Sequence, residues 1–250
     1  MITRATGFPL EVLFLRDDDI PQAVAMKLAD LGIVGLNEVE EAGEKVDIIL
    51  PLGFGGCRIS LAIPKEINYT GLEWFNGKSV ATSYPAILRN FFKEKGINAL
   101  IQKISGSVEV APAIGMTDAI FDIVSSGGTL VQNGLIEVER VFESEAVLIA
   151  NTNLSEEKLR EIEKLKLRFN SIINSRGMKY VLMNIPAKAL EDAKILLPGM
   201  KSPTIIPLER GDWYAIQVVI HEDELWEKIE KLKETGAEDI LVLSMENIIR

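Results

Sequence analysis

The sequence is poor in residues that several common kinds of site require. Its 250 residues include one histidine, His221, and one cysteine, Cys57. A histidine-based catalytic triad and a zinc site built from several histidines are therefore excluded for this chain. A single cysteine cannot form an internal disulfide, which favours a reducing compartment and predicts a cytoplasmic protein.

Long apolar runs and basic charge are also scarce. No apolar run approaches the roughly 20 residues that a membrane helix needs, and Met1–Arg4 lacks the features of a secretory signal. Acidic residues outnumber basic ones, 37 to 27, giving a formal net charge of −10. Nucleic acids and anionic membranes need a basic surface, so neither is expected as a partner. A phosphorylated small molecule is compatible with this charge, because backbone N–H groups and Mg²⁺ can bind phosphates.

The first part of the chain alternates between strand and helix patterns. The apolar run Leu10–Leu15 predicts a strand buried on both faces. A helix is expected from Pro21 to about Ala29, with the preceding aspartates as its cap. Asp30–Gly35 is predicted as a strand that closes on glycine. Together these segments predict one βαβ unit.

A second alternating set predicts a second α/β lobe. Its helix starts at Pro85 and stops at Gly96, and the strand Ala146–Ala150 is expected to return the chain to the first lobe. A long helix then runs from Ser155 to Gly177. The strands expected for the second lobe are Lys78–Thr82, Ala99–Ile104 and Asp118–Val124, and a further strand is expected before it at Cys57–Ile63.

The last 70 or so residues have a different pattern, βαββαβ, which is typical of ferredoxin-like domains. We therefore expect a first lobe at residues 1–70 and 146–177, a second at 71–145, and a ferredoxin-like domain at 178–250. The expected elements of that domain are strands Lys179–Asn184, Thr204–Pro207, Trp213–Ile220 and Asp239–Ser244, with helices Ala187–Leu197 and Asp223–Thr235.

The clearest chemical pattern lies at the end of the strand Asp118–Val124. The glycines of the following loop let the backbone approach an anion, and its serine and threonine hydroxyls add donors. A short helix after the loop would bring its positive end to the same place. Asp122, one loop away, can accept hydrogen bonds from sugar hydroxyls, so the pattern indicates a ribose phosphate site, with an ordinary structural loop as an equally weighted alternative. The loop residues are Ser125, Ser126, Gly127, Gly128 and Thr129.

The whole stretch Gly106–Pro112 and Gly115–Leu130 resembles the signature of ATP phosphoribosyltransferases. Other segments resemble that family in the right order, and the resemblance covers essentially all 250 residues. These segments are Phe14–Pro21, Asp30–Gly35, Gly53–Arg58, Ala81–Pro85 and Leu196–Thr204.

The resemblance implies the long, histidine-regulated form of the family, with a two-lobed body like that of periplasmic binding proteins. The implied reaction joins N1 of ATP to the ribose of phosphoribosyl pyrophosphate and expels pyrophosphate, as the first step of histidine biosynthesis. It needs Mg²⁺ and no covalent nucleophile. Asp122 would hold the ribose hydroxyls and Ser125–Thr129 the 5-phosphate. The tail would bind histidine as an allosteric inhibitor, and the chains would form dimers and hexamers.

On the ATP side the resemblance implies Arg16, Asp30, Gly32 and Gly35. For Arg16 the alternative is an ion pair with Asp17–Asp19, residues that are themselves helix caps or Mg²⁺ ligands. Gly32 and Gly35 are expected in a tight turn beside adenine, with plain turn glycines as the alternative.

Three further residues have simple expected roles. Glu109 is a candidate ligand of Mg²⁺ or ribose, or else a helix-start carboxylate. Cys57 is expected in the core and His221 at a helix entry.

Members of the family normally begin with a strand, a loop bearing Gly-Arg and a helix before the segment that resembles Leu10–Pro21. This sequence starts after them, and we therefore expect a gap in the first lobe with unpaired edges. Two other classes of function follow as alternatives. One is a small-molecule-binding protein, and the other is a catalytically impaired or truncated paralogue with a regulatory role.

Overall fold

The computed structural model describes residues 2–125 and 127–250. The chain divides into two compact units, which we call unit 1 (residues up to Glu156) and unit 2 (Glu157–Arg250). Within the described residues, no helix is long and apolar enough to cross a membrane.

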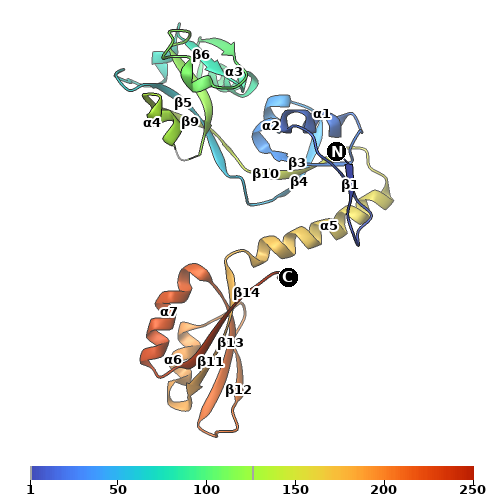
Figure 1. The fold of residues 1–250 in the computed structure, drawn as a ribbon, viewed down its shortest axis with the longest axis vertical. Helices are drawn as coiled ribbons and strands as arrows, with labels where there is room; N and C mark the ends of the chain where they lie inside the picture. Colours follow the sequence, from blue (N-terminus) through green and yellow to red (C-terminus); the bar gives the residue numbers. More distant parts are fainter. Residues whose placement is uncertain (1, 126) are drawn as a thin grey trace. The chain divides into compact units, whose positions relative to one another are not determined.

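The larger lobe of unit 1 is built on a five-stranded sheet in the order β7-β6-β8-β5-β9 (Figure 1). Strand β6 pairs in parallel with β7 and β8, whereas β5 pairs antiparallel with β8 and β9. Helix α3 packs on one face, and a smaller cluster that includes η3 and α4 residues covers the other. The strands are β5 (Cys57–Pro64), β6 (Ser79–Thr82), β7 (Leu100–Lys103), β8 (Ala119–Val124) and β9 (Leu135–Ser144), and the helices are η2 (Leu72–Phe75), α3 (Pro85–Lys95), η3 (Val108–Val110) and α4 (Gly128–Gln132).

The predictions for this lobe hold closely. Gly96 ends α3 in a left-handed conformation, with φ of 70°, as its position predicted. Phe121, on β8, is fully buried in the core. The pairing also places β5 in this sheet, although the expected division at residue 70 assigned it to the first lobe.

The other lobe of unit 1 holds a three-stranded sheet in the order β3-β10-β4. Strand β10 (Ala146–Asn151) pairs antiparallel with both neighbours, β3 (Leu31–Gly35) and β4 (Val46–Pro51), so the predicted return of the chain is confirmed. Helices α1 (Ile20–Ala25) and α2 (Leu36–Ala42) pack on it through a small valine-rich core. The β4–β5 and β9–β10 segments link the two sheets (Figure 1), giving the two-lobed α/β body of periplasmic-binding-protein-like folds.

A strand forms within Leu10–Leu15 as predicted, but the prediction that it is buried on both faces was wrong. Strand β2 (Glu11–Leu13) is mostly exposed and pairs only with β1 (Ile2–Arg4), antiparallel, in a sheet of its own. A turn containing Gly7, with φ of 78°, returns the chain, so the run finds its partner locally instead of in the lobe. Because β2 and β3 lie in different sheets, they do not form a βαβ unit.

The start of α1 also differs from the prediction. A 3-10 turn, η1 (Asp17–Asp19), precedes the helix, and no aspartate side chain caps either element. The helix ends at Ala25, four residues early, because Lys27 takes a left-handed conformation with φ of 64°.

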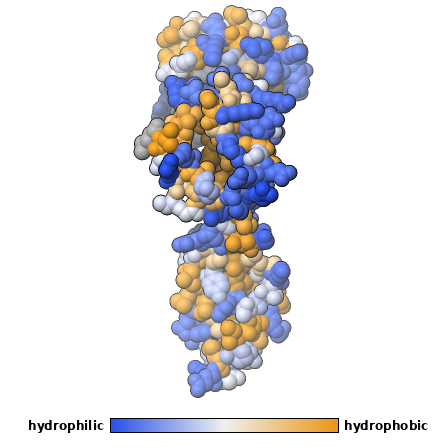
Figure 2. Space-filling model, turned by 90° about the vertical axis from the view of Figure 1, so that its right-hand side faces the viewer, coloured by the Kyte–Doolittle hydropathy of each residue, from blue (hydrophilic) through white to orange (hydrophobic). Residues whose placement is uncertain are grey.

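Unit 2 confirms the ferredoxin-like prediction. Its antiparallel sheet has the order β12-β13-β11-β14, with α6 and α7 contributing to one core. The end of the chain is held to the long helix α5, since Ser171 O accepts a 2.8 Å hydrogen bond from Ile248 N. Hydrophobic and hydrophilic residues alternate over the surface seen in Figure 2. The elements are α5 (Glu156–Ser175), β11 (Met178–Pro186), η4 (Ala187–Ala189), α6 (Leu190–Leu196), β12 (Thr204–Pro207), β13 (Trp213–His221), α7 (Glu222–Glu234) and β14 (Glu238–Ser244).

Candidate active site

The carboxyl ends of the parallel strands β6 and β8 meet at one edge of the five-stranded sheet, where α/β folds commonly bind ligands. At the end of β6, the buried Thr82 Oγ1 accepts a 2.8 Å bond from Tyr84 N and so fixes the turn into α3. Near the end of β8 lies Asp122, which is half-buried. The sheet therefore brings the start of α3 and Asp122 to the same edge.

The short helix predicted after the loop that follows β8 is present as α4. Gly127 is the N-cap of α4 and has φ of 80°, a conformation that favours glycine. Ser125, Gly128 and Thr129 are exposed, so their polar groups can meet a ligand. Ser126 lies outside the described residues. Helix α4 has only five residues, so its dipole contributes little and the loop's own donors matter more.

Asp122 has an unusual electrostatic setting. Burial raises the pKa of its carboxyl, a 2.8 Å hydrogen bond from Ile123 N opposes the shift, and the negative charge of Glu109 raises it again. Glu109 sits in η3, so the structure places these two carboxylates near each other. In the part of the chain that the structure describes, no group of three or more histidine, cysteine or acidic residues could hold a metal.

A second polar cluster, which we call the loop network, lies behind the loop. Arg58 donates two 2.6 Å bonds to Glu137 and one of 3.1 Å from Nη1 to the carbonyl oxygen of Ser125. Ser60 Oγ also donates to Glu137, at 2.8 Å. These bonds, with burial opposing, lower the pKa of Glu137 to about 2.

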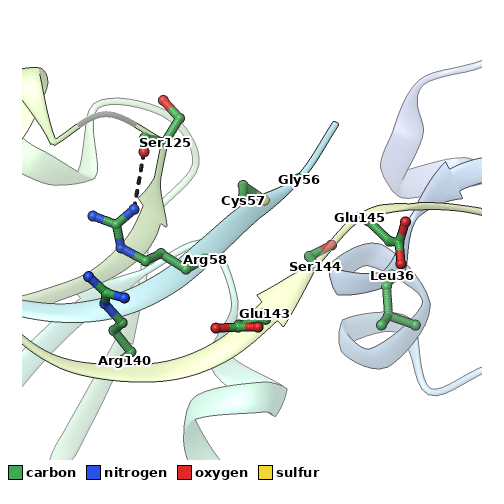
Figure 3. A pocket seen from close by; sticks show the side chains of 9 residues that line it. All are labelled: Leu36, Gly56, Cys57, Arg58, Ser125, Arg140, Glu143, Ser144 and Glu145. Atoms are coloured by element: carbon green, nitrogen blue, oxygen red, sulfur yellow. Dashed lines mark hydrogen bonds between the residues drawn. The ribbon is translucent and has the colours of Figure 1, made fainter. Parts of the chain in front are cut away.

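A hollow of about 460 Å³ opens beside the loop network (Figure 3). Arg58 reaches from it towards Ser125, while Leu36 and Glu145 lie at its opposite end (Figure 3). The prediction that Cys57 is a core residue was wrong, because it is half-buried on this wall. The lining residues are Leu36, Gly56, Cys57, Arg58, Ser125, Arg140, Glu143, Ser144 and Glu145.

A third cluster, which we call the bridging network, joins the two lobes of unit 1. The Glu41 carboxylate, on α2, accepts bonds of 2.9–3.0 Å from the backbone N–H groups of Ala86 and Ile87, at the start of α3. Tyr84 OH donates to Glu38 at 3.1 Å, and Asn37 Nδ2 donates to Tyr84 OH at 3.3 Å. The remaining member is Ser144, which donates to Asn37 Oδ1 at 2.7 Å.

The bridging network is buried and acidic. Burial is the main cause that raises the pKa of Glu38, and the hydrogen bond from Tyr84 opposes it. The charges of Asp17, Asp18 and Glu41 raise it further, so η1 lies close to α2. Burial and the neighbouring Glu38 also raise the pKa of Tyr84, which therefore stays protonated as a donor.

The four residues predicted on the ATP side occupy β3 and its surroundings. Arg16 is exposed and forms the alternative ion pair, with its Nε 3.1 Å from Asp18 Oδ1. Asp30 immediately precedes β3. The tight turn predicted for Gly32 and Gly35 is absent, because both lie within β3 and neither has a positive φ.

These two glycines instead make room for neighbours. A Cβ at Gly32 would come within 2.6 Å of Ile20 Cγ2, so glycine lets α1 pack closely on β3. A Cβ at Gly35 would collide with the side-chain oxygen of Asn37. His221 is at the predicted helix entry, where it caps α7 by accepting a 3.4 Å bond from Asp223 N.

Most members of the two networks are not predicted by any pattern in the sequence. The pairs are distant in the chain, 79 residues apart for Arg58 and Glu137 and 45 for Glu41 and Ala86. One signal was available: Glu137 and Glu139 are acidic positions within a strand-forming segment, where a charge needs a partner.

Comparison with known proteins agrees with this geometry. A family model described as ATP phosphoribosyltransferase matches residues 16–171, and one described as the HisG C-terminal domain matches residues 175–247. These matches define a phosphoribosyltransferase, an enzyme of the glycosyltransferase class. More narrowly, the chain belongs to the ATP phosphoribosyltransferase family, whose reaction opens histidine biosynthesis.

Curated relatives support the assignment over the whole chain. The ATP phosphoribosyltransferases of Parabacteroides distasonis and Bacteroides thetaiotaomicron are 58% and 57% identical over 249 residues. Each match covers 100% of this chain and 88% of the relative. The fold also resembles that in the ATP phosphoribosyl transferase (HisG:HisZ) complex from Thermotoga maritima, with a TM-score of 0.58 and 23% identity, covering 66% of this chain and 84% of that one.

Proposed function

We propose that this chain transfers the phosphoribosyl group of phosphoribosyl pyrophosphate to N1 of ATP and releases pyrophosphate. In this proposal, the lobe with the five-stranded sheet binds phosphoribosyl pyrophosphate, and the lobe with β3, β10 and β4 binds ATP. Residues 178–250 form the regulatory domain. One observation carries the proposal. Asp122 and the glycine turn at Gly127 are separated by only a short loop, and both lie at the edge of the sheet where α/β folds commonly bind ligands.

The proposed roles follow from the donors and acceptors present. Asp122 accepts hydrogen bonds from the ribose hydroxyls, because among the described residues its only hydrogen-bond donor is Ile123 N. The hydroxyls and backbone N–H groups of Ser125–Thr129, with Ser126 included from the sequence, bind the 5-phosphate. Catalysis then rests on positioning C1 of the ribose against N1 of adenine, and no covalent nucleophile is needed.

For ATP, we propose contacts from Arg16, Asp30, Gly32 and Gly35. The Arg16 side chain is largely exposed, so it can exchange its single ion pair for a phosphate at little cost. Gly32 and Gly35 contribute backbone along β3, close to where α2 begins.

Mg²⁺ is the proposed metal. Mg²⁺ sites of this type use one or two carboxylates together with substrate phosphates. Glu109 can supply such a carboxylate, because it lies near enough to Asp122 for its charge to raise the pKa of the Asp122 carboxyl. Phosphate oxygens of the substrates would supply the other Mg²⁺ ligands. When bound, the ion would stabilise negative charge on the departing pyrophosphate.

For unit 2, we propose histidine binding and feedback inhibition, within a cytoplasmic homo-oligomer of dimers that form hexamers. Exposed apolar side chains on β14, Leu241 and Leu243, support self-association because water would otherwise cover them. Light scattering of the purified chain tests the assembly.

The test of the reaction is formation of phosphoribosyl-ATP from ATP, phosphoribosyl pyrophosphate and Mg²⁺, followed by absorbance with and without histidine. Asp122→Asn should lower kcat/KM by roughly 100-fold, since a neutral amide accepts weaker hydrogen bonds from the ribose. The matched control is Glu66→Gln, an exposed acid in the same lobe, which should leave turnover unchanged. Full activity in folded Asp122→Asn would refute the site, and insensitivity to histidine would refute the regulation.

A further inference from the structure

The loop network contains an arginine that the proposed reaction does not use. Arg58 lies on β5, where its register partner on β8 is Val124, the last residue before the loop. The pairing of β5 with β8 therefore places the Arg58 guanidinium at the start of the loop that follows β8. Its Nη1 donates to the Ser125 carbonyl oxygen at 3.1 Å, as Figure 3 shows.

The guanidinium is held rigidly for this contact. Its Nε and Nη2 bind the two oxygens of Glu137 at 2.6 Å each, a bidentate geometry that fixes the plane of the group. Ser60 and Arg140 also donate to Glu137, at 2.8 and 3.3 Å. The side chains of Arg58 and Glu137 are only 23% and 20% exposed. Rotation of Arg58 would therefore break several bonds at once.

The same cluster also reaches the ribose side of the site. Ser60 on β5 is the register partner of Asp122 on β8, so their side chains are neighbours on one face of the sheet. Glu137 thus connects, through Ser60 and Arg58, to the strand positions beside both Asp122 and Ser125.

We propose that Arg58 is a positioning residue, which fixes the start of the phosphate loop relative to β8 through the Ser125 carbonyl and is itself oriented by Glu137. This inference rests on the proposed function of the loop. It predicts that Arg58 controls affinity for phosphoribosyl pyrophosphate without touching ATP. A purely structural ion pair would instead change stability and leave both substrate affinities alone.

Two variants and one control test the proposal in the full-length chain. Arg58→Met removes all three bonds, two to Glu137 and one to Ser125, and Arg58→Lys keeps the charge but cannot bind Glu137 and Ser125 in the same geometry. The control is Arg140→Met, which also loses a bond to Glu137 but, among the residues the structure describes, donates to no loop residue; its side chain is 66% exposed.

The kinetic readout separates the substrates. Arg58→Met should raise KM for phosphoribosyl pyrophosphate roughly tenfold, and Arg58→Lys should have a KM between that of Arg58→Met and that of the wild type. In both variants KM for ATP should change less than about twofold. Arg140→Met should leave both values within about twofold. An unchanged KM for phosphoribosyl pyrophosphate in folded Arg58→Met, or an equal rise in both KM values, would overturn the proposal.

A second readout does not depend on activity. Amide hydrogen exchange in peptides covering α4 and the loop before it should be roughly five times faster in the Arg58 variants than in wild type, and unchanged in Arg140→Met. Equal exchange in all proteins would refute the positioning role even if the wild type showed no turnover. Conversely, if exchange is faster in the Arg58 variants but the wild type shows no turnover, the positioning role of Arg58 is supported and the proposed reaction is rejected.

Discussion

The loop network and the bridging network differ in what they hold together. The loop network links β5, β8 and β9 within one sheet, so its partners stay together in any arrangement of the lobes. The bridging network binds α2 of one lobe to the start of α3 in the other. Its bonds must break if the lobes move apart. One network therefore holds the proposed phosphate loop, and the other couples the two lobes of unit 1.

Their electrostatics differ in the same way. Glu137 faces Arg58 and Arg140, and its pKa is lowered to about 2. Glu38 is half-buried beside other carboxylates, and its pKa is raised. Ionisation of Glu137 thus stabilises the fold, whereas ionisation of Glu38 costs free energy.

The largest effect should come from removing the carboxylate that caps α3. Glu41→Ala leaves the N–H groups of Ala86 and Ile87 without their acceptor, so unit 1 should lose about 3 kcal/mol of unfolding free energy. Hydrogen exchange in peptides from β6 and β8 under denaturant measures this loss. Glu40→Ala is the control, since Glu40 is the exposed neighbour on the same helix.

An equal loss in both variants would show that helix propensity explains the effect and that the bridge contributes nothing. A large loss confined to Glu41→Ala would show that the cap on α3 joins the lobes.

The loop network should show a specific pH dependence. Because the folded-state pKa of Glu137 lies below its ordinary value of 4.5, its contribution is fully present above pH 4.5 and is lost as pH falls towards 2. Glu137→Gln should cost about 2 kcal/mol at pH 7. The gap between wild type and variant should shrink between pH 5 and pH 2.5, measured by urea unfolding at each pH. A gap that stays constant would mean that Glu137 is not the titrating group.

The predictability of the fold follows the regularity of the sequence. In unit 2, buried Val181, Met183 and Ile185 alternate with other residues, and β12 has the predicted bounds Thr204–Pro207. In the first 50 residues the patterns are weaker. The apolar run around β2 specified a strand but not its partner, and the seven residues of α2 are too few for a clear helical period.

The residues of the candidate site also differ in how far the sequence predicts them. Asp122 and the loop after it could be predicted because their chemistry is contained in eight consecutive residues. Arg58 and Glu137 could not, because they meet only through the order of strands and two register shifts between β5 and β9. The contact of Glu41 with α3 requires the packing of two lobes, which local patterns do not encode.

The smallest effect compares two tyrosines that each donate to a glutamate. Tyr84 OH donates to Glu38 across the lobes at 3.1 Å, whereas Tyr69 OH donates to Glu139 within one lobe at 2.6 Å. Each Tyr→Phe change should cost about 1 kcal/mol, because one hydrogen bond to a half-buried carboxylate is lost. Only Tyr84→Phe should also speed hydrogen exchange in α2, since of these two tyrosine bonds only the one from Tyr84 joins α2 to the start of α3. If Tyr69→Phe speeds it equally, the bridging network does not hold the lobes together, and Glu41 acts only as a helix cap.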